Sequence, residues 1–400
     1  MSVIYPKITT SFLKLASACL TIPEAPTIVG AGKRAEAVSY LKKKGYKKAL
    51  IITSPSIVRY GFTDVITEGL KAQGMDYIIT TEVAPDPTFA IAQSIRKKGM
   101  EAGVDCIIAI GGGSVLDCSK LVAASLVSKC RSVESFAGLL RVFKKPMEMI
   151  AIPSTAGTGS ESTFIAVISN SETHQKKTMV SPKIVPDLAI LDGEMLTKMP
   201  AKFAASTGMD ALSHAVESYI STFNRRKTHD KHAPMAIKAI FENLYTSFCE
   251  QDNVEVKNKM LLASYYAGIS MNNEMVGYAH AFAHQLGGVY GVPHGEAIGI
   301  TLPQVLEYNR KSAEKKMAKL AVYCGLGTQD MPADKLADAF IAKVKDLRDS
   351  MGLPAKCDKL KEEDYDMIIA NAFKETSVRY PVAKFMTKQD ARDFLNAIKG

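Results

Sequence analysis

The sequence predicts an α/β protein with two domains, a Rossmann-like parallel sheet followed by an all-helical domain. Over the first half of the chain, short β-branched runs alternate with helical patterns, as expected of parallel strands joined by crossover helices. After about Pro200 the strand-like runs give way to long amphipathic segments. A length of 400 residues suits two ordinary domains. We expect them to cover residues 1–199 and 200–400 and to pack around a shared cleft.

Four strands are expected in the first domain, each short and nearly wholly apolar, as strands buried on both faces should be. They are Lys48–Thr53, Asp76–Thr80, Asp105–Ile110 and Met149–Ile152. Apolar residues at helical intervals predict helices between and after them. These helices are Val58–Gln73, Thr88–Ala102 and Val115–Leu126. In the second domain, the same periodicity predicts helices over Phe203–Ile220 and from Pro234 onward.

The charge and hydropathy patterns argue against two classes of partner. The chain has 50 Lys and Arg residues against 41 Asp and Glu, a net charge of +9. The excess is spread over stretches such as Leu41–Lys48 and Lys311–Lys319, which indicates solvated surface rather than a polyanion-binding patch. We therefore expect no nucleic-acid partner. No stretch approaches the roughly 18 apolar residues of a membrane span, so we expect no membrane insertion.

Cysteine usage indicates a reducing compartment. The seven cysteines lie mostly inside apolar runs and form no Cys-x-x-Cys pair, which is typical of reduced core thiols. Residues 1–20 lack the apolar core and the cleavage site of a secretory signal. We therefore expect a cytoplasmic protein.

A glycine-rich turn follows the expected strand Asp105–Ile110. Gly111, Gly112, Gly113 and Ser114 lead directly into a helical pattern, and such a turn presents backbone N–H groups and a helix N-terminus to an anion. Glycine lets a phosphate approach the backbone closely. The motif is neither the dinucleotide fingerprint nor a Walker A loop, so a tight turn without a ligand is the alternative.

A second cluster of small residues, PSTAGTGSEST, follows the strand that ends at Ile152 and runs from Pro153 to Thr163. Two such loops at the carboxyl ends of parallel strands are placed to line one crevice, where open α/β sheets bind their ligands. Together the two loops favour a nucleotide site over a ligand-free turn.

Three of the seven histidines, His280, His284 and His294, lie within fifteen residues. His214 follows Asp210 by four positions, which puts carboxylate and imidazole on one helix face, one turn apart. One carboxylate and three imidazoles suit a divalent ion such as Fe²⁺ or Zn²⁺ and leave a coordination position for a substrate oxygen. The spacing alone leaves open which of His280 and His284 binds the metal.

The other histidines lack this grouping, and a lone histidine is more often a packed or exposed side chain than a ligand. His174, His229 and His232 are therefore not expected to bind metal. The last two lie in the basic run Arg225–His232, where we expect solvated side chains.

Five motifs, in order along the chain, resemble those of the iron-containing alcohol dehydrogenase family, which includes lactaldehyde, 1,3-propanediol and butanol dehydrogenases. They are GGGSVLD (Gly111–Asp117), STAGTGSE (Ser154–Glu161), PDLAILD (Pro186–Asp192), TGMDALSHAVESY (Thr207–Tyr219) and GYAHAFAHQLGGVYGVPHG (Gly277–Gly295). The resemblance runs from roughly Thr27 to Tyr308. It implies the two-domain architecture shared with dehydroquinate synthase, and a homodimer or larger homo-oligomer.

The resemblance also assigns roles to single residues. It implies that Asp210, His214, His280 and His294 bind the metal and that His284 is a proton relay. It further implies a set of contacts to NAD or NADP, with the glycine turn at the pyrophosphate. This set is Gly111, Gly112, Gly113, Ser114, Asp117, Thr155, Thr158, Thr163 and Lys176, with Lys177 as the alternative to Lys176.

The chain departs from the family pattern at three places. Ser54 stands where many NAD-using members have an acidic residue that accepts hydrogen bonds from the adenosine ribose. Without that carboxylate a 2′-phosphate is not repelled, so NADP becomes acceptable. The usual Asn-Pro-Arg segment appears as Arg379-Tyr380-Pro381-Val382, which leaves substrate choice open. The family's Pro-Asn-Pro-Thr appears as Pro85-Asp86-Pro87-Thr88, which places a carboxylate near the expected nicotinamide end.

The function expected from these features is a metal-dependent alcohol dehydrogenase or aldehyde reductase acting on a small primary alcohol or aldehyde. A polyol or hydroxyacid dehydrogenase of the same fold is the main alternative. A dehydroquinate synthase-like lyase needs convergent basic residues, which the apolar surroundings of Tyr278, Phe282 and Val289 do not supply. A non-catalytic dinucleotide-binding protein is disfavoured because all four ligand positions are filled.

Overall fold

The computed structural model describes the chain from residue 22 onward, apart from residues 172–174, 223–230 and 381. Of residues 273, 274 and 377–379 it describes the backbone only. The chain forms two compact units. An α/β unit comprises the described residues through Met199 together with Gln251–Gly268, and a helical unit comprises Pro200–Glu250 and Ile269–Gly400. The sequence-based division had assigned every residue after 199 to the second domain, so Gln251–Gly268 differs from it.

The α/β unit is built on a six-stranded parallel sheet with the order β1-β9-β6-β4-β2-β3. The strands are β1 (Thr27–Val29), β2 (Lys48–Ile52), β3 (Asp76–Thr80), β4 (Cys106–Gly111), β6 (Glu148–Pro153) and β9 (Leu188–Leu191). The four predicted strands are confirmed to within one residue at each end. The other two were not predicted, because β1 is three residues long and partly exposed and the four-residue β9 follows no helical crossover pattern.

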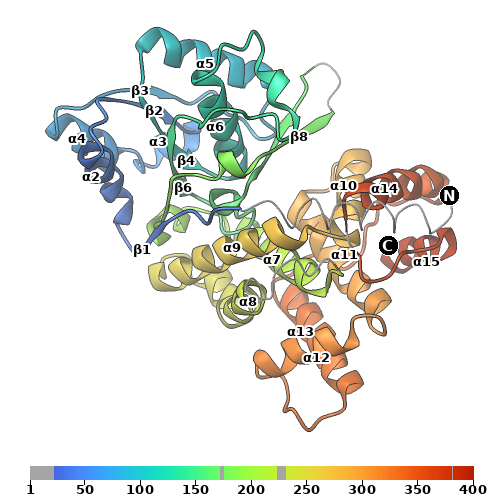
Figure 1. Ribbon diagram of the computed structural model, residues 1–400. Coiled ribbons are helices and arrows are strands. Elements are labelled where there is room, and N and C mark those ends of the chain that lie inside the picture. Colours follow the sequence, from blue (N-terminus) through green and yellow to red (C-terminus); the bar gives the residue numbers. More distant parts are fainter. Residues whose placement is uncertain (1–21, 172–174, 223–230, 381) are drawn as a thin grey trace. The chain divides into compact units, whose positions relative to one another are not determined.

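Helices cover the sheet and make it a buried layer (Figure 1). Leu50, Ile107 and Met149, which are paired in register across β2, β4 and β6, share one hydrophobic core with helices α5 and α6. Ile51 and Ile108, which point to the opposite face, are also completely buried. Both faces are therefore covered, as the apolar strands indicated. The helices that cover the sheet are α2 (Glu36–Lys43), α4 (Asp64–Ala72), α5 (Phe89–Ala102) and α6 (Gly113–Leu126).

One helix predicted as continuous in the α/β unit is interrupted in the structure. The expected helix Val58–Gln73 is two helices, α3 (Pro55–Arg59) and α4. Gly61 lies between them with φ of +72°, a left-handed conformation that ends a helix and that glycine adopts without strain. The apolar periodicity runs through the break and so does not reveal it.

The candidate cofactor residues follow the carboxyl ends of these parallel strands. Ser54 comes two residues after β2, the segment Gly111–Ser114 joins the end of β4 to the start of α6, and the loop Ser154–Thr163 follows β6. Since all six strands run in the same direction, the three segments share one edge of the sheet. A smaller sheet with the order β5-β8-β7 also belongs to this unit and carries Lys176. Its strands are β5 (Gly138–Leu139), β7 (Ile165–Ser169) and β8 (Lys176–Val180).

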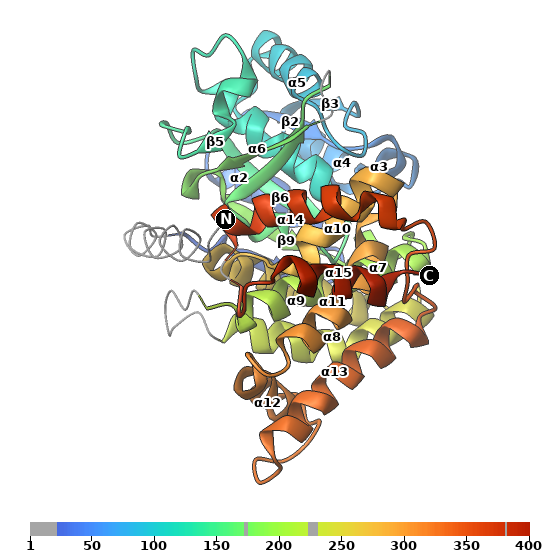
Figure 2. The same cartoon turned by 90° about the vertical axis from the view of Figure 1, so that its right-hand side faces the viewer.

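The helical unit carries the candidate metal ligands. Its helices α14 and α15 run along α10 and α11 (Figure 2). Helices were predicted at Phe203–Ile220 and from Pro234, and the first is confirmed, while the second begins two residues earlier at His232. The helices are α7 (Ala201–Ile220), α8 (His232–Cys249), α10 (Tyr278–Tyr290), α11 (His294–Asn309), α12 (Glu314–Tyr323), α13 (Ala333–Ser350), α14 (Tyr365–Arg379) and α15 (Lys388–Ile398), with α9 (Val254–Glu274) divided between the two units.

The sequence also predicts that no helix spans a membrane and that the cysteines are reduced. None of the helices described has both the length and the apolar character needed to cross a membrane. Within the same part of the chain the cysteines are free thiols, and Cys106, Cys118 and Cys357 are buried.

Candidate metal and cofactor sites

Three imidazoles surround one carboxylate oxygen in the helical unit. Oδ1 of Asp210 on α7 lies 3.2 Å from Nε2 of His294 on α11 and 3.5 Å from Nε2 of His280 on α10. Nε2 of His214, one turn after Asp210 on α7, is 3.7 Å from the same oxygen. The ligand atoms of Asp210, His280 and His294 all lie within 4.8 Å of one another, a grouping that could hold a metal ion.

His214, the fourth predicted ligand, lies beside this group. The imidazole of His214 stacks on that of His280, with ring centroids 4.7 Å apart and planes 16° from parallel. Asp210, His214 and His280 are buried, whereas the side chain of His294 is 44 % exposed. The cluster is therefore enclosed on the sides of α7 and α10 and accessible at His294.

A glycine allows the helices to approach closely enough for this arrangement. A Cβ added to Gly295, the second residue of α11, would lie 2.4 Å from the backbone oxygen of Ser206 on α7. Any side chain there would force the two helices apart. Since His294 precedes Gly295 and Asp210 is one turn after Ser206, this contact sets their separation.

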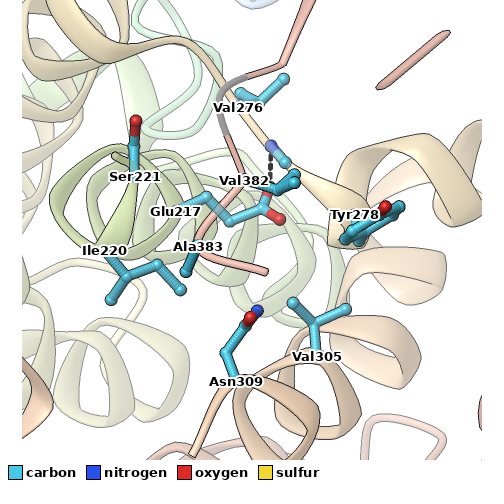
Figure 3. Close-up of a pocket in the computed structure, with 10 residues that line it drawn as sticks. Glu217, Ile220, Ser221, Val276, Tyr278, Val305, Asn309, Val382 and Ala383 are labelled. Atoms are coloured by element: carbon cyan, nitrogen blue, oxygen red, sulfur yellow. Dashed lines mark hydrogen bonds between the residues drawn. The ribbon is translucent and has the colours of Figure 1, made fainter. Parts of the chain in front are cut away.

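The carboxylate of Glu217 orients His280 and caps the helix that carries it. It accepts hydrogen bonds from Nδ1 of His280 at 2.7 Å and from the backbone N–H groups of Gly277 at 3.0 Å and Ala279 at 2.7 Å. Figure 3 shows the Glu217 side chain pointing to the backbone of this turn. A carboxylate on the far nitrogen of a histidine fixes the ring and its tautomer, which leaves Nε2 of His280 directed at the cluster.

A small cavity lies beside Glu217 and is also lined by Ser221 and Asn309 (Figure 3). Its volume of about 10 Å³ is close to the space that one water molecule needs. Gly277 contributes to the fit, because a Cβ there would lie 2.7 Å from Oε1 of Glu217. The absence of a side chain at Gly277 therefore leaves room for the buried carboxylate of Glu217.

The electrostatics of the cluster favour positive charge. Burial raises the pKa of the Asp210 carboxyl, but His214, His294 and His280 outweigh this effect and hold the pKa well below its usual range. Burial lowers the pKa of His280, but Asp210 and Glu217 outweigh it and raise the pKa to about 9. Two buried carboxylates therefore produce a negative potential at the point where the Nε2 atoms converge.

Among the described residues, Oδ1 of Asp210 and Nε2 of His280 are buried atoms without a hydrogen-bond partner of good geometry. Leaving such atoms unpaired costs free energy, and a cation at their centre would remove the cost. This donor set, one carboxylate oxygen with imidazole nitrogens, is one that Fe²⁺ and Zn²⁺ accept. The residues present therefore fit a divalent metal.

The predicted proton relay lies next to the cluster. The ring of His284 stacks on that of His294, with centroids 5.4 Å apart, and lies 6.0 Å from that of His280. Its side chain is 40 % exposed, and its Nδ1 is 2.8 Å from Oε1 of Glu375. His284 is thus engaged through Nδ1 by a carboxylate that the sequence did not single out.

Two of the three remaining histidines cannot be placed, and the third differs from expectation. His174 and His229 lie outside the described residues. His232 was expected in a solvated run, but it is 4 % exposed at the start of α8. Packing of the helix N-terminus overrides the polar pattern of its neighbours.

In the α/β unit, the glycine turn and the Ser154–Thr163 loop are in close contact. A Cβ on Gly113 would lie 2.8 Å from Cγ2 of Thr158, and one on Gly112 would lie 3.3 Å from Cγ2 of Thr155. A Cβ on Gly111 would lie 2.6 Å from Val115 within its own turn. Packing therefore requires glycine at positions 111 and 113. This is a second reason for glycine, in addition to the close approach of a phosphate that the sequence analysis considered.

The N-terminus of α6 can accept an anion. Gly112 is its N-cap, and no side chain caps the helix. The first backbone N–H groups of α6, from Gly113 and Ser114, are thus presented at the carboxyl end of β4. Its role as a phosphate loop stays a prediction.

Behind the turn, buried charged groups connect the two loops. Asp117 accepts hydrogen bonds from the Ser160 hydroxyl at 2.5 Å and from the Val167 N–H at 2.8 Å. Lys120 donates to the Thr163 hydroxyl at 2.9 Å and lies 3.8 Å from Asp117. Asp117 and Thr163 thus act inside the protein as links that hold the loops.

A buried glutamate completes this group. Burial raises the pKa of Glu161 to about 7, against the opposing effect of the positive charge of Lys120. Burial lowers the pKa of Lys120 to about 8, opposed by Asp117 and Glu161. In the part of the chain that the structure describes, neither carboxylate oxygen of Glu161 has a hydrogen-bond partner, so the folded state disfavours its ionised form.

The last two predicted cofactor residues lie at the surface of the α/β unit. Ser54 is the N-cap residue of α3, and its hydroxyl is 3.0 Å from that of Ser56. Lys176 forms an exposed ion pair with Asp86 at 2.8 Å. The carboxylate expected near the nicotinamide is therefore paired with the lysine predicted for the cofactor.

Several residues that matter to these sites were missed in the sequence. Glu217 follows His214 by three positions and Asp210 by seven, so it falls on the ligand face of α7, and this spacing could have identified it. Lys120 is one turn after Asp117 in the same way. Glu375 gives no such signal, because its partner His284 is 91 positions away.

Comparisons with known proteins agree with this architecture. A family model described as "Iron-containing alcohol dehydrogenase" matches residues 25–193, and one described as "Fe-containing alcohol dehydrogenase family, C-terminal" matches residues 204–398. The chain is 32 % identical to NAD-dependent methanol dehydrogenase of Bacillus methanolicus over 356 residues, 88 % of this chain and 93 % of that protein. It is 34 % identical to lactaldehyde reductase of Escherichia coli K12 over 315 residues, 78 % of this chain and 82 % of that protein.

Solved structures give the same result. An alcohol dehydrogenase from Oenococcus oeni superposes with a TM-score of 0.88 at 30 % identity, covering 94 % of this chain and 100 % of that one. A 1,3-propanediol oxidoreductase gives a TM-score of 0.87 at 29 % identity, covering 94 % and 99 %. The chain belongs to the iron-containing alcohol dehydrogenase family, as its motifs indicated, and is an oxidoreductase of alcohols and aldehydes that depends on a metal and on a nicotinamide dinucleotide.

Proposed function

We propose that Asp210, His214, His280 and His294 hold one divalent cation, Fe²⁺ or Zn²⁺. The observation that carries this proposal is the set of 3.2, 3.5 and 3.7 Å separations between Oδ1 of Asp210 and the three Nε2 atoms. Ligands about 2.1 Å from an ion at the corners of a tetrahedron lie about 3.4 Å apart. The separations match that spacing.

We propose further that the loops at the carboxyl edge of the sheet bind the dinucleotide. The N-terminus of α6, with Gly111, Gly112, Gly113 and Ser114, would hold the pyrophosphate through backbone N–H groups. Thr155 and Thr158, which pack on these glycines, would line the cofactor, with Asp117 and Thr163 holding the loops in place. Both NAD and NADP suit the site, because Ser54 brings no charge to repel a 2′-phosphate.

The reaction is the interconversion of a small primary alcohol and its aldehyde. A bound divalent cation supplies Lewis acidity for the C–O group, and the nicotinamide accepts or supplies the hydride. Asp210 and the imidazoles of the cluster would hold that cation, and Glu217 keeps the ring of His280 in place. His284 takes up the hydroxyl proton in oxidation and returns it in reduction.

An activity panel tests the proposal. Purified protein is assayed by absorbance of the reduced nicotinamide with acetaldehyde and butyraldehyde, using NADH and NADPH, before and after removal of metal with a chelator. We expect aldehyde-dependent oxidation that is lost on chelation and restored by Fe²⁺ or Zn²⁺. Undiminished activity in protein shown to be metal-free would contradict it. Diols and hydroxyacids in the same panel test the alternative of a polyol or hydroxyacid dehydrogenase.

We also propose that the protein is a homodimer or a larger homo-oligomer and that it acts in the cytoplasm. The buried free thiols Cys106, Cys118 and Cys357 support a reducing compartment. Light scattering coupled to size-exclusion chromatography measures the assembly directly, and a mass of 43.4 kDa for the eluted species would contradict it.

A further inference from the structure

Beside the metal cluster, His284, Glu375 and Tyr380 form a hydrogen-bonded chain that the metal ligands do not explain. Nδ1 of His284 on α10 is 2.8 Å from Oε1 of Glu375 on α14. The same oxygen accepts a hydrogen bond from the phenol of Tyr380 at 2.6 Å. The three residues lie in the helical unit, and Tyr380 belongs to the segment in which this chain departs from the family pattern.

The contact determines which nitrogen of His284 carries the proton. An ionised carboxylate only accepts hydrogen bonds, so Nδ1 of the neutral imidazole must be the donor to Glu375. Nε2 is then the nitrogen with the free lone pair. A neutral histidine in this tautomer can take a proton at Nε2 without losing its bond to Glu375.

The carboxylate is itself held in one orientation. The side chain of Glu375 is 21 % exposed, and Tyr380 is 7 % exposed, so the phenol and the imidazole bind a largely enclosed acceptor. Two donors on one oxygen restrict the rotation of the carboxylate. A hydrogen bond to a charged group is also roughly twice as strong as one between neutral groups.

The position of His284 makes this orientation relevant to chemistry. Its ring stacks on that of His294 at 22° between planes, next to the most exposed member of the metal cluster. Its side chain remains 40 % exposed, which gives a route for a proton to solvent. A purely structural histidine–carboxylate pair has no need of either property.

We propose that Glu375, braced by Tyr380, is a positioning residue that holds His284 as the Nδ1–H tautomer, with Nε2 as the proton acceptor in alcohol oxidation. This inference rests on the proposed function. The alcohol hydroxyl loses its proton to Nε2 while the carbon loses a hydride to the oxidised nicotinamide, which gives the aldehyde. The imidazolium then releases the Nε2 proton to solvent, and Nδ1–H stays bonded to Glu375 throughout. Reduction follows the same path in reverse.

The test is a double-mutant cycle on the metal-loaded enzyme, with H284A, E375A and H284A/E375A. If Glu375 acts through His284, we expect E375A to lower kcat about 10- to 100-fold, with metal content unchanged and KM changed less than kcat. In the H284A background the same substitution should lower kcat less than twofold. An equal loss in both backgrounds would overturn the proposal, since Glu375 would then act on the fold or the metal.

Conservative variants keep the test valid if E375A folds poorly. E375Q retains an oxygen that can accept from Nδ1–H, so it should recover part of the kcat lost in E375A, and Y380F should lower kcat less than E375A does. On the same helix, Asp366 forms an exposed ion pair with Arg392, and D366A is the matched control, with kcat unchanged. If E375Q is no better than E375A, the orienting role is refuted.

A spectroscopic readout separates this inference from the proposed function. In protein labelled with ¹⁵N-histidine, the resonances that disappear in H284A identify the ring, and their shifts report the tautomer. We expect the Nδ1–H form in the wild type and in E375Q, and a mixture of tautomers in E375A. A wild-type Nε2–H form would overturn the inference. If instead the proposed function is wrong, the activity assay would show turnover that does not depend on metal.

Discussion

Side chains form the polar site of the helical unit, whereas backbone groups form that of the α/β unit. Around Asp210, side chains from three helices approach one oxygen, and within the described part of the chain Oδ1 of Asp210 and Nε2 of His280 are buried without a hydrogen-bond partner. At the start of α6, the groups offered to a ligand are N–H groups, while the nearby side chains of Asp117 and Lys120 are satisfied by the protein. The first site should therefore depend strongly on single side chains, and the second on close packing of loops.

The largest effect is expected from Glu217, which orients His280 from outside the ligand set. Replacing it with alanine removes the acceptor for Nδ1 of His280 and for two N–H groups at the N-terminus of α10. We expect E217A to lower metal affinity by about 100-fold, the upper end for such partners. Competition with a chelator of known affinity measures this. E217Q should lie between E217A and the wild type. Unchanged affinity in E217A would show that the ligands do not need this support.

The next effect is a pH dependence from Glu161 in the α/β unit. Its pKa is about 7 when folded and 4.5 as the ordinary value, so between these pH values the unfolded chain is ionised while the folded one is protonated. Stability should thus fall as the pH rises through this window, with a slope on the order of 1 kcal/mol per pH unit. Glutamine cannot ionise, so the stability of E161Q relative to the wild type should increase as the pH rises over the same range.

Urea midpoints at pH 5 and pH 8 for the two proteins provide the measurement. The control is E101Q, because Glu101 has an exposed side chain in an ion pair with Lys97 on the surface of α5. A constant difference between E161Q and the wild type at the two pH values would mean that Glu161 is ionised in the folded protein.

A smaller effect should follow from the glycine turn. The Cβ of G113A would lie 2.8 Å from Cγ2 of Thr158, so the second loop must shift away from the N-terminus of α6. We expect KM for the dinucleotide to rise about tenfold, since the N–H groups no longer converge as well on a phosphate. Metal content should stay at the wild-type level. A loss of metal in G113A would contradict the independence of the two sites.

The smallest effect concerns the choice of dinucleotide. In S54D a carboxylate replaces the hydroxyl beyond the end of β2, where it would repel a 2′-phosphate. We expect kcat/KM for NADPH to fall about fivefold relative to NADH, which corresponds to about 1 kcal/mol for partly screened charges. S54N, which has the same shape without the charge, is the control. Equal changes for the two cofactors would show that position 54 does not meet the adenosine ribose.

Sequence patterns predicted the buried part of the fold and missed what depends on local geometry. Strands such as Cys106–Gly111 were found because they are continuous apolar runs covered on both faces. The break at Gly61 was missed because apolar periodicity does not register a left-handed residue. The short strand Thr27–Val29 was missed because its burial is only partial.

The candidate sites were likewise predicted only where the residues are close together in the sequence. Asp210 and His214 could be paired from their spacing on one helix, but the approach of His280 and His294 depends on how α10 and α11 pack on α7. Glu375 lies 91 positions from His284, and no local pattern connects them. Residues that act through a contact between distant helices therefore become visible only in the folded chain.

The most direct test is the metal content of purified variants, because two histidines one turn apart on α10 are assigned different roles. Elemental analysis of the wild type, D210A, H280A and H284A gives the number of Fe or Zn ions per chain. We expect about one ion in the wild type and in H284A, and nearly none in D210A and H280A. Full metal content in H280A, or its loss in H284A alone, would contradict the assignment of the metal centre.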